Sequence, residues 1–349
     1  MRRLLLLASE RYSMPILQPV ADAATARGDV VAWLASPAIG AHLPAGAQWI
    51  RSRPALRAFA ADATLATVHR IAPQLPGLHV QLFHGLSTDK RDPARGHFKV
   101  RGLFDLYCTH GPATTGPFEA LARTHRNFAV CETGWPKLDP LFASDRSGAD
   151  ALRAQSGGRP VVMLASTFTE SLSAARDLLP HLRDWVQRGD RHWLLTLHPK
   201  SDPALIDAYR ALQGPHATWM ESDRLLDMLR ASDVLVCDTS SVIEEACLID
   251  VPIVTVRTRV PKAFMHDVAA AGDVDAAIDM ALRHDPARVQ AMRAYAQAIH
   301  PHRDGHSAGR VLAAIDDLLD SDRTGLARRP FNAWRRIHEA AGLRRLLPE

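Results

Sequence analysis

A hydroxyl-rich segment between a buried strand and a helix constrains the fold of this chain more than any other feature. Val234–Cys237 is an apolar run of strand type, and residues 238–241, Asp-Thr-Ser-Ser, interrupt it. Residues 242–249 resume with helical spacing, and Ile253–Val256 is a second apolar strand. The pattern predicts a βαβ unit with polar residues at the carboxyl end of a strand. In open α/β sheets ligands bind there, and a helix amino terminus favours phosphate.

Strand-like and helix-like runs alternate along most of the chain. We expect strands at residues 4–7, 30–34, 78–83, 128–131, 161–165 and 192–197, and helices at 16–27, 54–72, 172–186 and 203–212. The last part, residues 263–319, is helical in pattern, and the glycine-rich residues 145–160 resemble a linker. This alternation predicts parallel sheets with crossover helices. We therefore expect an α/β fold with two Rossmann-like domains, residues 1–150 and 151–322, followed by a basic segment, residues 323–349.

Composition and absent motifs exclude several classes of protein. A 47% hydrophobic content over 349 residues indicates an ordinary globular protein. The four cysteines lack CxxC spacing, which favours buried free thiols over disulfides or a zinc site, and we expect no metal. The apolar run near the start is too short for a signal peptide, and no run approaches the length of a membrane span. P-loop, dinucleotide, GxSxG and HExxH motifs are absent. We expect a cytoplasmic protein.

Two histidines stand where predicted strands end, and both are candidate catalytic residues. His84 follows an apolar run and precedes Gly85, and His198 precedes Pro199. Histidine suits proton transfer near neutral pH, and Gly85 would allow a sharp turn and close approach of a substrate. Either histidine alone is more often a structural residue. Their equivalent positions in successive domains favour a functional role.

Two turns could bind phosphate. Residues 238–241 could simply cap the following helix, with Ser241 and nearby Glu244 or Glu245 resembling a capping arrangement. Four consecutive small polar residues exceed what a cap requires, so we favour contact with a phosphate or nucleotide. A second turn, residues 304–307, precedes another predicted helix, and it could meet the other phosphate of a diphosphate.

Motifs in the same order resemble the CDP-glycerol glycerophosphotransferases, which build teichoic-acid and related capsular polymers of the cell envelope. Residues 83–88 resemble the W-H-G-T segment of that family, and residues 133–139 resemble G-Y-P-R-N-D. Residues 197–199 resemble R-P-H-P, and residues 237–242 resemble T-D-Y-S-S-V. Residues 304–310 match D-G-K-A-S-E-R more weakly. The likeness spans roughly residues 78 to 312.

This resemblance implies a GT-B fold with two facing Rossmann-like domains, the acceptor held by the first and the nucleotide by the second. It implies metal-independent transfer of a glycerol-phosphate-type group from a CDP-activated donor to an acceptor hydroxyl of a glycan or lipid-linked polymer, without a cofactor. His84 would be the base, and His198 would stabilise the diphosphate. The expected binding residues are Gly85, Gly134, Pro136, Ser166, Thr167, Asp238, Thr239, Ser240, Ser241, Glu245, Asp304, Gly305 and Ser307.

Other features of the sequence leave alternatives open. Thr196 and Leu197 depart from R-P-H-P, and Leu86-Ser87 replaces Thr-Pro after the first histidine and glycine. Residues 244–246, Glu-Glu-Ala, and residues 251–257 resemble the non-hydrolysing UDP-N-acetylglucosamine 2-epimerases, which share the GT-B fold. The H-R-R-E-N segment of that family is absent, because residues 165–170 read Ala-Ser-Thr-Phe-Thr-Glu. A nucleotide-sugar-dependent glycosyltransferase is therefore the first alternative and an epimerase the second.

The basic character of the chain is concentrated at its end. Residues 323–349 hold seven arginines and two glutamates, a net charge of +5, against +4 for the whole chain. An amphipathic basic helix here could lie on the anionic inner face of the cytoplasmic membrane, or it could pack on the first domain. Aromatic and basic residues do not interleave elsewhere, which disfavours nucleic acid as a partner. A nucleotide- or polymer-binding protein without catalysis is the non-enzyme alternative.

Overall fold

The chain forms two compact units, each built around its own parallel sheet. The structure is a computed structural model that describes residues 1–86, 98–322, 326–330, 343 and 346–347. One unit comprises Met1–Phe142 and Ala298–Glu349, and the other Ala143–Gln297. We expected domain boundaries between residues 150 and 151 and between residues 322 and 323. In the structure the second unit begins at Ala143, and the chain returns to the first unit at Ala298. Residues 298–322 return because α12 (Ser307–Asp320) packs on α1 (Met14–Ala26) and on strands of the first sheet.

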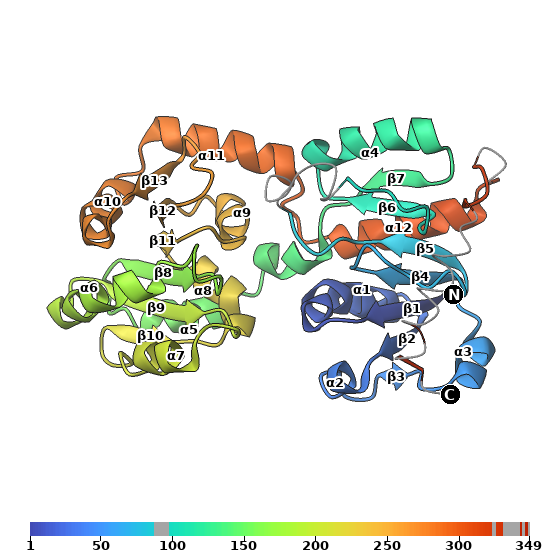
Figure 1. The fold of residues 1–349 in the computed structure, drawn as a ribbon, viewed down its shortest axis with the longest axis horizontal. Helices are drawn as coiled ribbons and strands as arrows, with labels where there is room; N and C mark the ends of the chain where they lie inside the picture. Colours follow the sequence, from blue (N-terminus) through green and yellow to red (C-terminus); the bar gives the residue numbers. More distant parts are fainter. Residues whose placement is uncertain (87–97, 323–325, 331–342, 344–345, 348–349) are drawn as a thin grey trace. The chain divides into compact units, whose positions relative to one another are not determined.

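A seven-stranded parallel sheet forms the centre of the first unit, in the order β3-β2-β1-β4-β5-β6-β7 (Figure 1). This is the Rossmann order, in which the direction of strand addition reverses between β1 and β4. Its strands are β1 (Arg3–Ala8), β2 (Val30–Ala35), β3 (Gln48–Trp49), β4 (Ala63–Ala66), β5 (Leu78–Gln81), β6 (Leu106–Thr109) and β7 (Ala129–Glu132). Every residue of β4, β5 and β6 is buried, as expected for strands covered on both faces.

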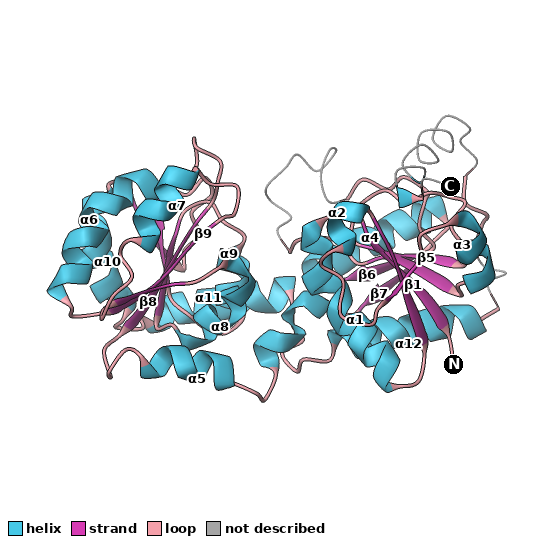
Figure 2. Ribbon diagram, turned by 90° about the horizontal axis from the view of Figure 1, so that it is seen from below, coloured by secondary structure: helices cyan, strands magenta, loops and turns pink. Residues whose placement is uncertain are grey.

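Helices cover both faces of this sheet (Figure 2). Besides α1 and α12 they are η1 (Arg11–Ser13), α2 (Pro37–Gly40), α3 (Arg53–Phe59), α4 (Pro112–His125) and η2 (Pro136–Phe142). The helix expected over residues 54–72 is wrong beyond Phe59, because β4 occupies Ala63–Ala66. The alanine-rich sequence there has high helix propensity, but burial between β1 and β5 selects the strand.

The second unit repeats the same topology with six parallel strands, ordered β10-β9-β8-β11-β12-β13. They are β8 (Val161–Ser166), β9 (His192–Leu197), β10 (Ala217–Trp219), β11 (Val234–Cys237), β12 (Ile253–Val256) and β13 (Met265–Val268). The direction in which strands are added to the sheet reverses between β8 and β11, which are parallel, hydrogen-bonded neighbours. The expectation of purely helical structure after residue 263 is wrong at β13, which extends the sheet beside β12.

Helices flank this sheet too, and a core of aliphatic side chains with Trp193 and Tyr209 lies beneath them. They are α5 (Ser147–Ala154), α6 (Ala175–Arg188), α7 (Pro203–Arg210), η3 (Ser222–Arg224), α8 (Leu225–Ala231), α9 (Val242–Cys247), η4 (Ala271–Asp273), α10 (Val274–Ala281) and α11 (Pro286–Ile299). Together the two units confirm the predicted α/β fold with two Rossmann-like parallel sheets.

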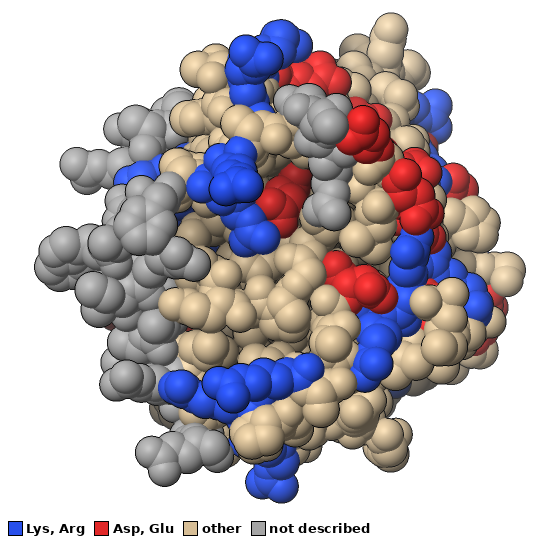
Figure 3. Space-filling model, turned by 90° about the vertical axis from the view of Figure 1, so that its right-hand side faces the viewer, with Lys and Arg blue, Asp and Glu red and all other residues tan. Residues whose placement is uncertain are grey.

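The described parts of the basic terminal segment pack on the first unit. Arg329 forms an ion pair of 2.8 Å with Asp105, and the backbone N–H of Ala327 donates to Arg126. Leu347 is buried in the core of that unit. Figure 3 shows basic and acidic side chains interspersed on one face of the molecule. Most of the amphipathic helix expected within residues 323–349 lies outside the described residues, so membrane contact stays a prediction.

Candidate nucleotide-binding and proton-transfer sites

Polar side chains gather where strand order reverses, at the carboxyl edge of each sheet. In open α/β sheets this reversal opens a crevice in which ligands bind. In the second unit the crevice lies between the ends of β8 and β11, which carry Ser166 and Asp238. In the first unit it lies between the ends of β1 and β4, beside His84 at the end of β5. Sequence reasoning therefore placed two of its candidate groups correctly at strand ends.

Asp238 braces the ends of β8 and β11 in the second unit from inside the protein. Its side chain is fully buried, and its carboxylate accepts hydrogen bonds from the Ser166 hydroxyl, from the Thr167 N–H at 3.0 Å and from the Ala174 N–H at 3.1 Å. Burial raises the pKa of Asp238, while these donors act in the opposite direction. The loop after β8 is thereby tied to the end of β11. Asp238 and Ser166 thus shape the expected binding site from inside.

The three hydroxyl residues that follow Asp238 form the outer part of the turn. Thr239 and Ser240 are partly exposed and Ser241 is exposed. The Ser241 side chain makes no cap hydrogen bond, so the expected capping by Ser241 is wrong; the Ser240 hydroxyl accepts the Val242 N–H at 3.4 Å instead. Because α9 has only six residues, its dipole is small, and hydroxyl groups are the main anion ligands on offer. Glu245 is 3% exposed and lies inside α9.

His198, at the end of β9, is a neutral hydrogen-bond donor. Its Nδ1 accepts the backbone N–H of Lys200 at 3.0 Å, so the proton of the neutral ring sits on Nε2. Burial and then the charge of Lys200 lower the pKa of His198. Near neutral pH its Nε2–H can therefore donate to an anion. Phe168, from the loop after β8, lies with its ring centroid 4.4 Å from the imidazole.

His84 in the first unit has the opposite arrangement. Its Nδ1 lies 3.2 Å from the carbonyl oxygen of Thr67, which can only accept, so Nδ1 carries the proton and Nε2 the lone pair. The side chain is exposed. The preceding residue, Phe83, is fully buried and has a φ of +58°, a conformation that is rare for aromatic residues. This conformation turns the chain, so that the next side chain, His84, faces outward. This geometry presents a proton acceptor.

The surroundings of His84 are held by buried contacts across the reversal point. The hydroxyls of Ser13 and Thr67, both fully buried, lie 2.8 Å apart and join the segments after β1 and β4. The rings of Tyr12 and His69 lie 5.4 Å and 5.3 Å from that of His84. Beside His84, a Cβ added to Gly85 would meet no atom of the described residues within 4 Å.

The expected second phosphate site at residues 304–307 stays a prediction, and the structure shows contacts inside the first unit for two of its residues, Asp304 and Ser307. Ser307 is 1% exposed, and its N–H and that of Ala308 donate to the Asp139 carboxylate at 2.9 Å and 2.8 Å. Asp139 thereby satisfies the N–H groups of the first two residues of α12. Asp304 pairs with Arg310 at 2.9 Å, which holds the pKa of that carboxyl well below its usual range.

Gly134 and Pro136, expected to bind substrate, are likewise buried, and Gly305, within the turn at residues 304–307, packs against Asp139 and Phe142. Gly134 has a φ of +76°, and a Cβ there would lie 2.6 Å from the Ser307 hydroxyl and 3.0 Å from His300 Nε2. The Gly134 turn and the Ser307 turn pack on one another. Their role is to join α12 to the sheet.

Replacement of Gly134 by alanine is expected to destabilise the first unit by about 2 kcal/mol, from backbone strain and displacement of Ser307. Thermal unfolding would report this loss. Gly116→Ala is the matched control, because a Cβ at that position in α4 meets nothing within 4 Å and alanine favours a helix. Equal melting temperatures for the two variants would contradict the structural role assigned to Gly134.

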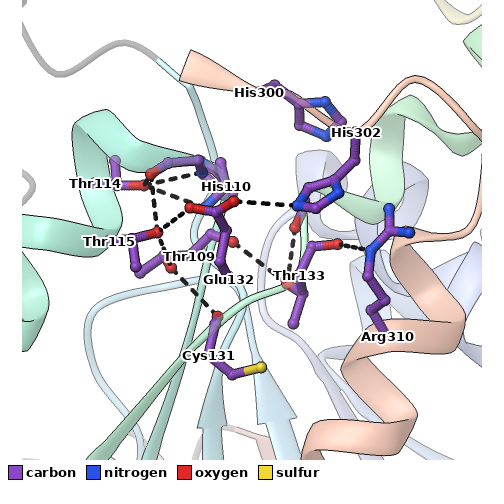
Figure 4. A network of polar contacts seen from close by, with 12 residues as sticks. Thr109, His110, Thr114, Thr115, Cys131, Glu132, Thr133, His300, His302 and Arg310 are labelled. Atoms are coloured by element: carbon purple, nitrogen blue, oxygen red, sulfur yellow. Dashed lines mark hydrogen bonds and ion pairs between the residues drawn. The ribbon is translucent and has the colours of Figure 1, made fainter. Parts of the chain in front are cut away.

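A polar network that sequence reasoning missed lies at the ends of β6 and β7 (Figure 4). Glu132 stands between the Thr115 hydroxyl, at 2.8 Å, and His302 Nε2, at 3.3 Å, while Thr109 and Thr115 share a hydrogen bond of 2.8 Å. His302 comes from the segment before α12, 170 positions along the chain. The network fastens the returning segment to the sheet. The only local signal was a glutamate at a strand end.

Two kinds of feature are absent from the described residues. No group of three or more histidine, cysteine, aspartate or glutamate side chains there is arranged to hold a metal ion. Within the same residues, no helix is long and apolar enough to cross a bilayer.

Solved structures of known proteins share this fold. A Listeria monocytogenes protein described as a UDP-N-acetylglucosamine 2-epimerase is 16% identical, with a TM-score of 0.63, over 94% of this chain and 99% of that one. S. aureus MnaA, solved with UDP, is 12% identical, with a TM-score of 0.64, over 92% of this chain and 97% of that one. The wall teichoic acid polymerase TagF is 13% identical, with a TM-score of 0.64, over 91% of this chain and 90% of that one. At such identities the likeness establishes the GT-B fold alone.

The sequence itself assigns a family. No curated protein sequence matches the chain. The profile of the family described as UDP-N-acetylglucosamine 2-epimerase matches residues 113–316, which is more than half of the chain. This match includes the turn at residues 238–241 and the Glu-Glu-Ala sequence after it. The chain belongs to the UDP-N-acetylglucosamine 2-epimerase family.

Proposed function

We propose that the protein is an enzyme acting on a nucleoside-diphosphate-linked sugar, with a UDP-linked N-acetylhexosamine as the first candidate substrate and epimerisation at C2 as the reaction. Family membership supports the substrate class and the reaction. The observation that carries the proposal is the braced crevice of the second unit, where Asp238 fixes the loop after β8 beside the hydroxyls of Thr239, Ser240 and Ser241. Hydroxyls and a neutral imidazole N–H can hold a diphosphate there.

For the chemistry, we assign complementary roles to the two histidines. The lone pair on His84 Nε2 would take the C2 proton as the bond from C1 to the diphosphate oxygen breaks. The electron pair of that bond leaves with UDP, and the His198 Nε2–H would donate to the departing diphosphate. Return of UDP to C1 and of a proton to the opposite face of C2 completes epimerisation. Each role follows from the tautomer that the histidine adopts within its own unit, Nδ1–H in His84 and Nε2–H in His198.

Incubation with UDP-N-acetylglucosamine in D₂O tests the proposal, because epimerisation through C2 deprotonation places deuterium at C2 of the product, which NMR detects. His84→Asn is expected to slow this exchange at least about a hundredfold while UDP affinity stays unchanged. His125→Asn, which removes an exposed histidine of α4, is the matched control. Unchanged exchange in the His84 variant would remove His84 as the base.

A second candidate is transfer of a polyol phosphate from a CDP-linked donor to an acceptor hydroxyl. The loop after β8 favours it, because residues 165–170 lack the H-R-R-E-N segment seen in the epimerases and resemble the transferases instead. In that reaction His84 would take the acceptor hydroxyl proton, and CMP would leave. Calorimetry with UDP and CDP separates the two candidates: binding of CDP without binding of UDP would overturn the epimerase proposal.

A further inference from the structure

An exposed aromatic ring lies at the edge of the second crevice. Phe168 is 45% exposed, and among the described residues only Tyr12 is a comparably exposed aromatic, beside His84. A single exposed apolar side chain is ordinary on a protein surface. Here, however, both exposed aromatic rings lie against the two strand-end histidines, which points to ligand contact rather than chance.

The loop that carries Phe168 is held in place. The preceding residue, Thr167, donates its N–H to Asp238, and the N–H groups of Leu172 and Ser173 donate to the carbonyl oxygen of Thr169 at 2.8 Å and 2.9 Å. The ring itself rests on His198, at 4.4 Å between centroids, and Lys200 Nζ lies 5.7 Å from the ring centroid. A ring supported on a braced loop can offer a flat apolar surface at little conformational cost.

The position of this ring relative to the hydroxyl turn is set by strand order. The turn at residues 239–241 follows β11, on one side of β8, and His198 follows β9, on the other side. Adjacent strands lie about 4.8 Å apart, so the loop of Phe168 and the turn leave the sheet from strand ends, those of β8 and β11, that are one strand spacing apart. A diphosphate at the hydroxyls would therefore leave the rest of a nucleotide free to extend toward Phe168.

We propose that Phe168 is the stacking surface for the base of the bound nucleotide. The inference rests on the proposed function and names a residue that determines how the nucleoside is held. A base stacked on an aromatic side chain gains affinity whatever its hydrogen-bonding edge, because every base has a π-face. Phe168 thus contributes affinity for nucleosides in general. Selection between uracil and cytosine comes from other groups.

Isothermal titration of UDP, CDP and inorganic pyrophosphate into purified variants tests this assignment. Phe168→Ala is expected to lower the affinity for the nucleotide that the wild type binds by about tenfold, because base stacking contributes affinity of this order. The affinity for pyrophosphate should stay unchanged. Phe168→Trp, which retains a flat ring, is expected to restore nucleotide affinity. Met280→Ala, which removes an exposed side chain from α10, is the matched control.

Each other outcome overturns the assignment. If the alanine variant weakens nucleotide and pyrophosphate equally, Phe168 acts only through the shape of the phosphate loop. If the wild type binds nucleotide and the alanine variant binds it equally well, the proposal that Phe168 stacks on the base is wrong, while the proposed function stands. If the wild type binds neither UDP nor CDP, both fail together.

Discussion

Substitution of Asp238 by alanine is expected to lower the free energy of unfolding of the second unit by about 4 kcal/mol. The fully buried carboxylate accepts hydrogen bonds from Ser166, Thr167 and Ala174, and its removal leaves these donors without their partner. Asp238→Asn is expected to cost less, because one amide oxygen can still accept. Urea unfolding followed by tryptophan fluorescence would detect this loss, because buried Trp185 and Trp193 lie in the core of this unit.

The same substitutions are expected to affect binding. Without the brace, the loop after β8 is no longer tied to β11, so UDP affinity in Asp238→Asn should fall at least about tenfold even where the variant is folded. Asp184→Ala, which removes an exposed carboxylate of α6, should change stability by less than about 0.5 kcal/mol. Should Asp238→Asn retain both wild-type stability and wild-type affinity, the crevice would not depend on this carboxylate.

Much of the fold could be predicted because strands of a parallel sheet are short, apolar runs. The expected strand at residues 192–197 matches β9, and Val234–Cys237 matches β11. Strand β4 was misread because its alanine and threonine residues carry no hydrophobic period, and only pairing with β1 and β5 identifies it. The return of α12 to the first unit depends on contacts with α1, which no local pattern records.

The candidate sites were predictable to the extent that they follow strand ends. His84, His198 and residues 238–241 lie at carboxyl edges because parallel strands all end on one side. The roles inside each site depend on partners distant in sequence. The link from Asp238 to Ser166 spans 72 positions and that from Asp139 to Ser307 spans 168. For this reason sequence alone did not predict that Asp238 and Ser307 are buried and hydrogen-bonded inside their units.

Acidification is expected to destabilise the first unit through His300. This side chain is fully buried, and its Nε2 accepts the backbone N–H of Trp135 at 2.9 Å. Burial, with a smaller effect from His302, lowers the pKa of His300 to about 4. The unfolded chain, with an ordinary histidine pKa of about 6.5, therefore binds this proton more readily than the folded chain. The stability contributed by neutral His300 is complete above pH of about 6.5 and is lost as pH falls toward about 4.

The size of this effect follows from the difference between the two pKa values, and it amounts to roughly 3 kcal/mol at the acid end. His300→Gln removes the titration, because the Gln oxygen can accept the Trp135 N–H at any of these pH values. Urea unfolding at pH 7, 6, 5 and 4 should therefore show a shallower loss of stability in this variant than in the wild type. His125→Gln, which removes an exposed histidine from α4 and leaves His300 in place, should keep the wild-type slope. Identical slopes for His300→Gln and the wild type would show that another group causes the acid sensitivity.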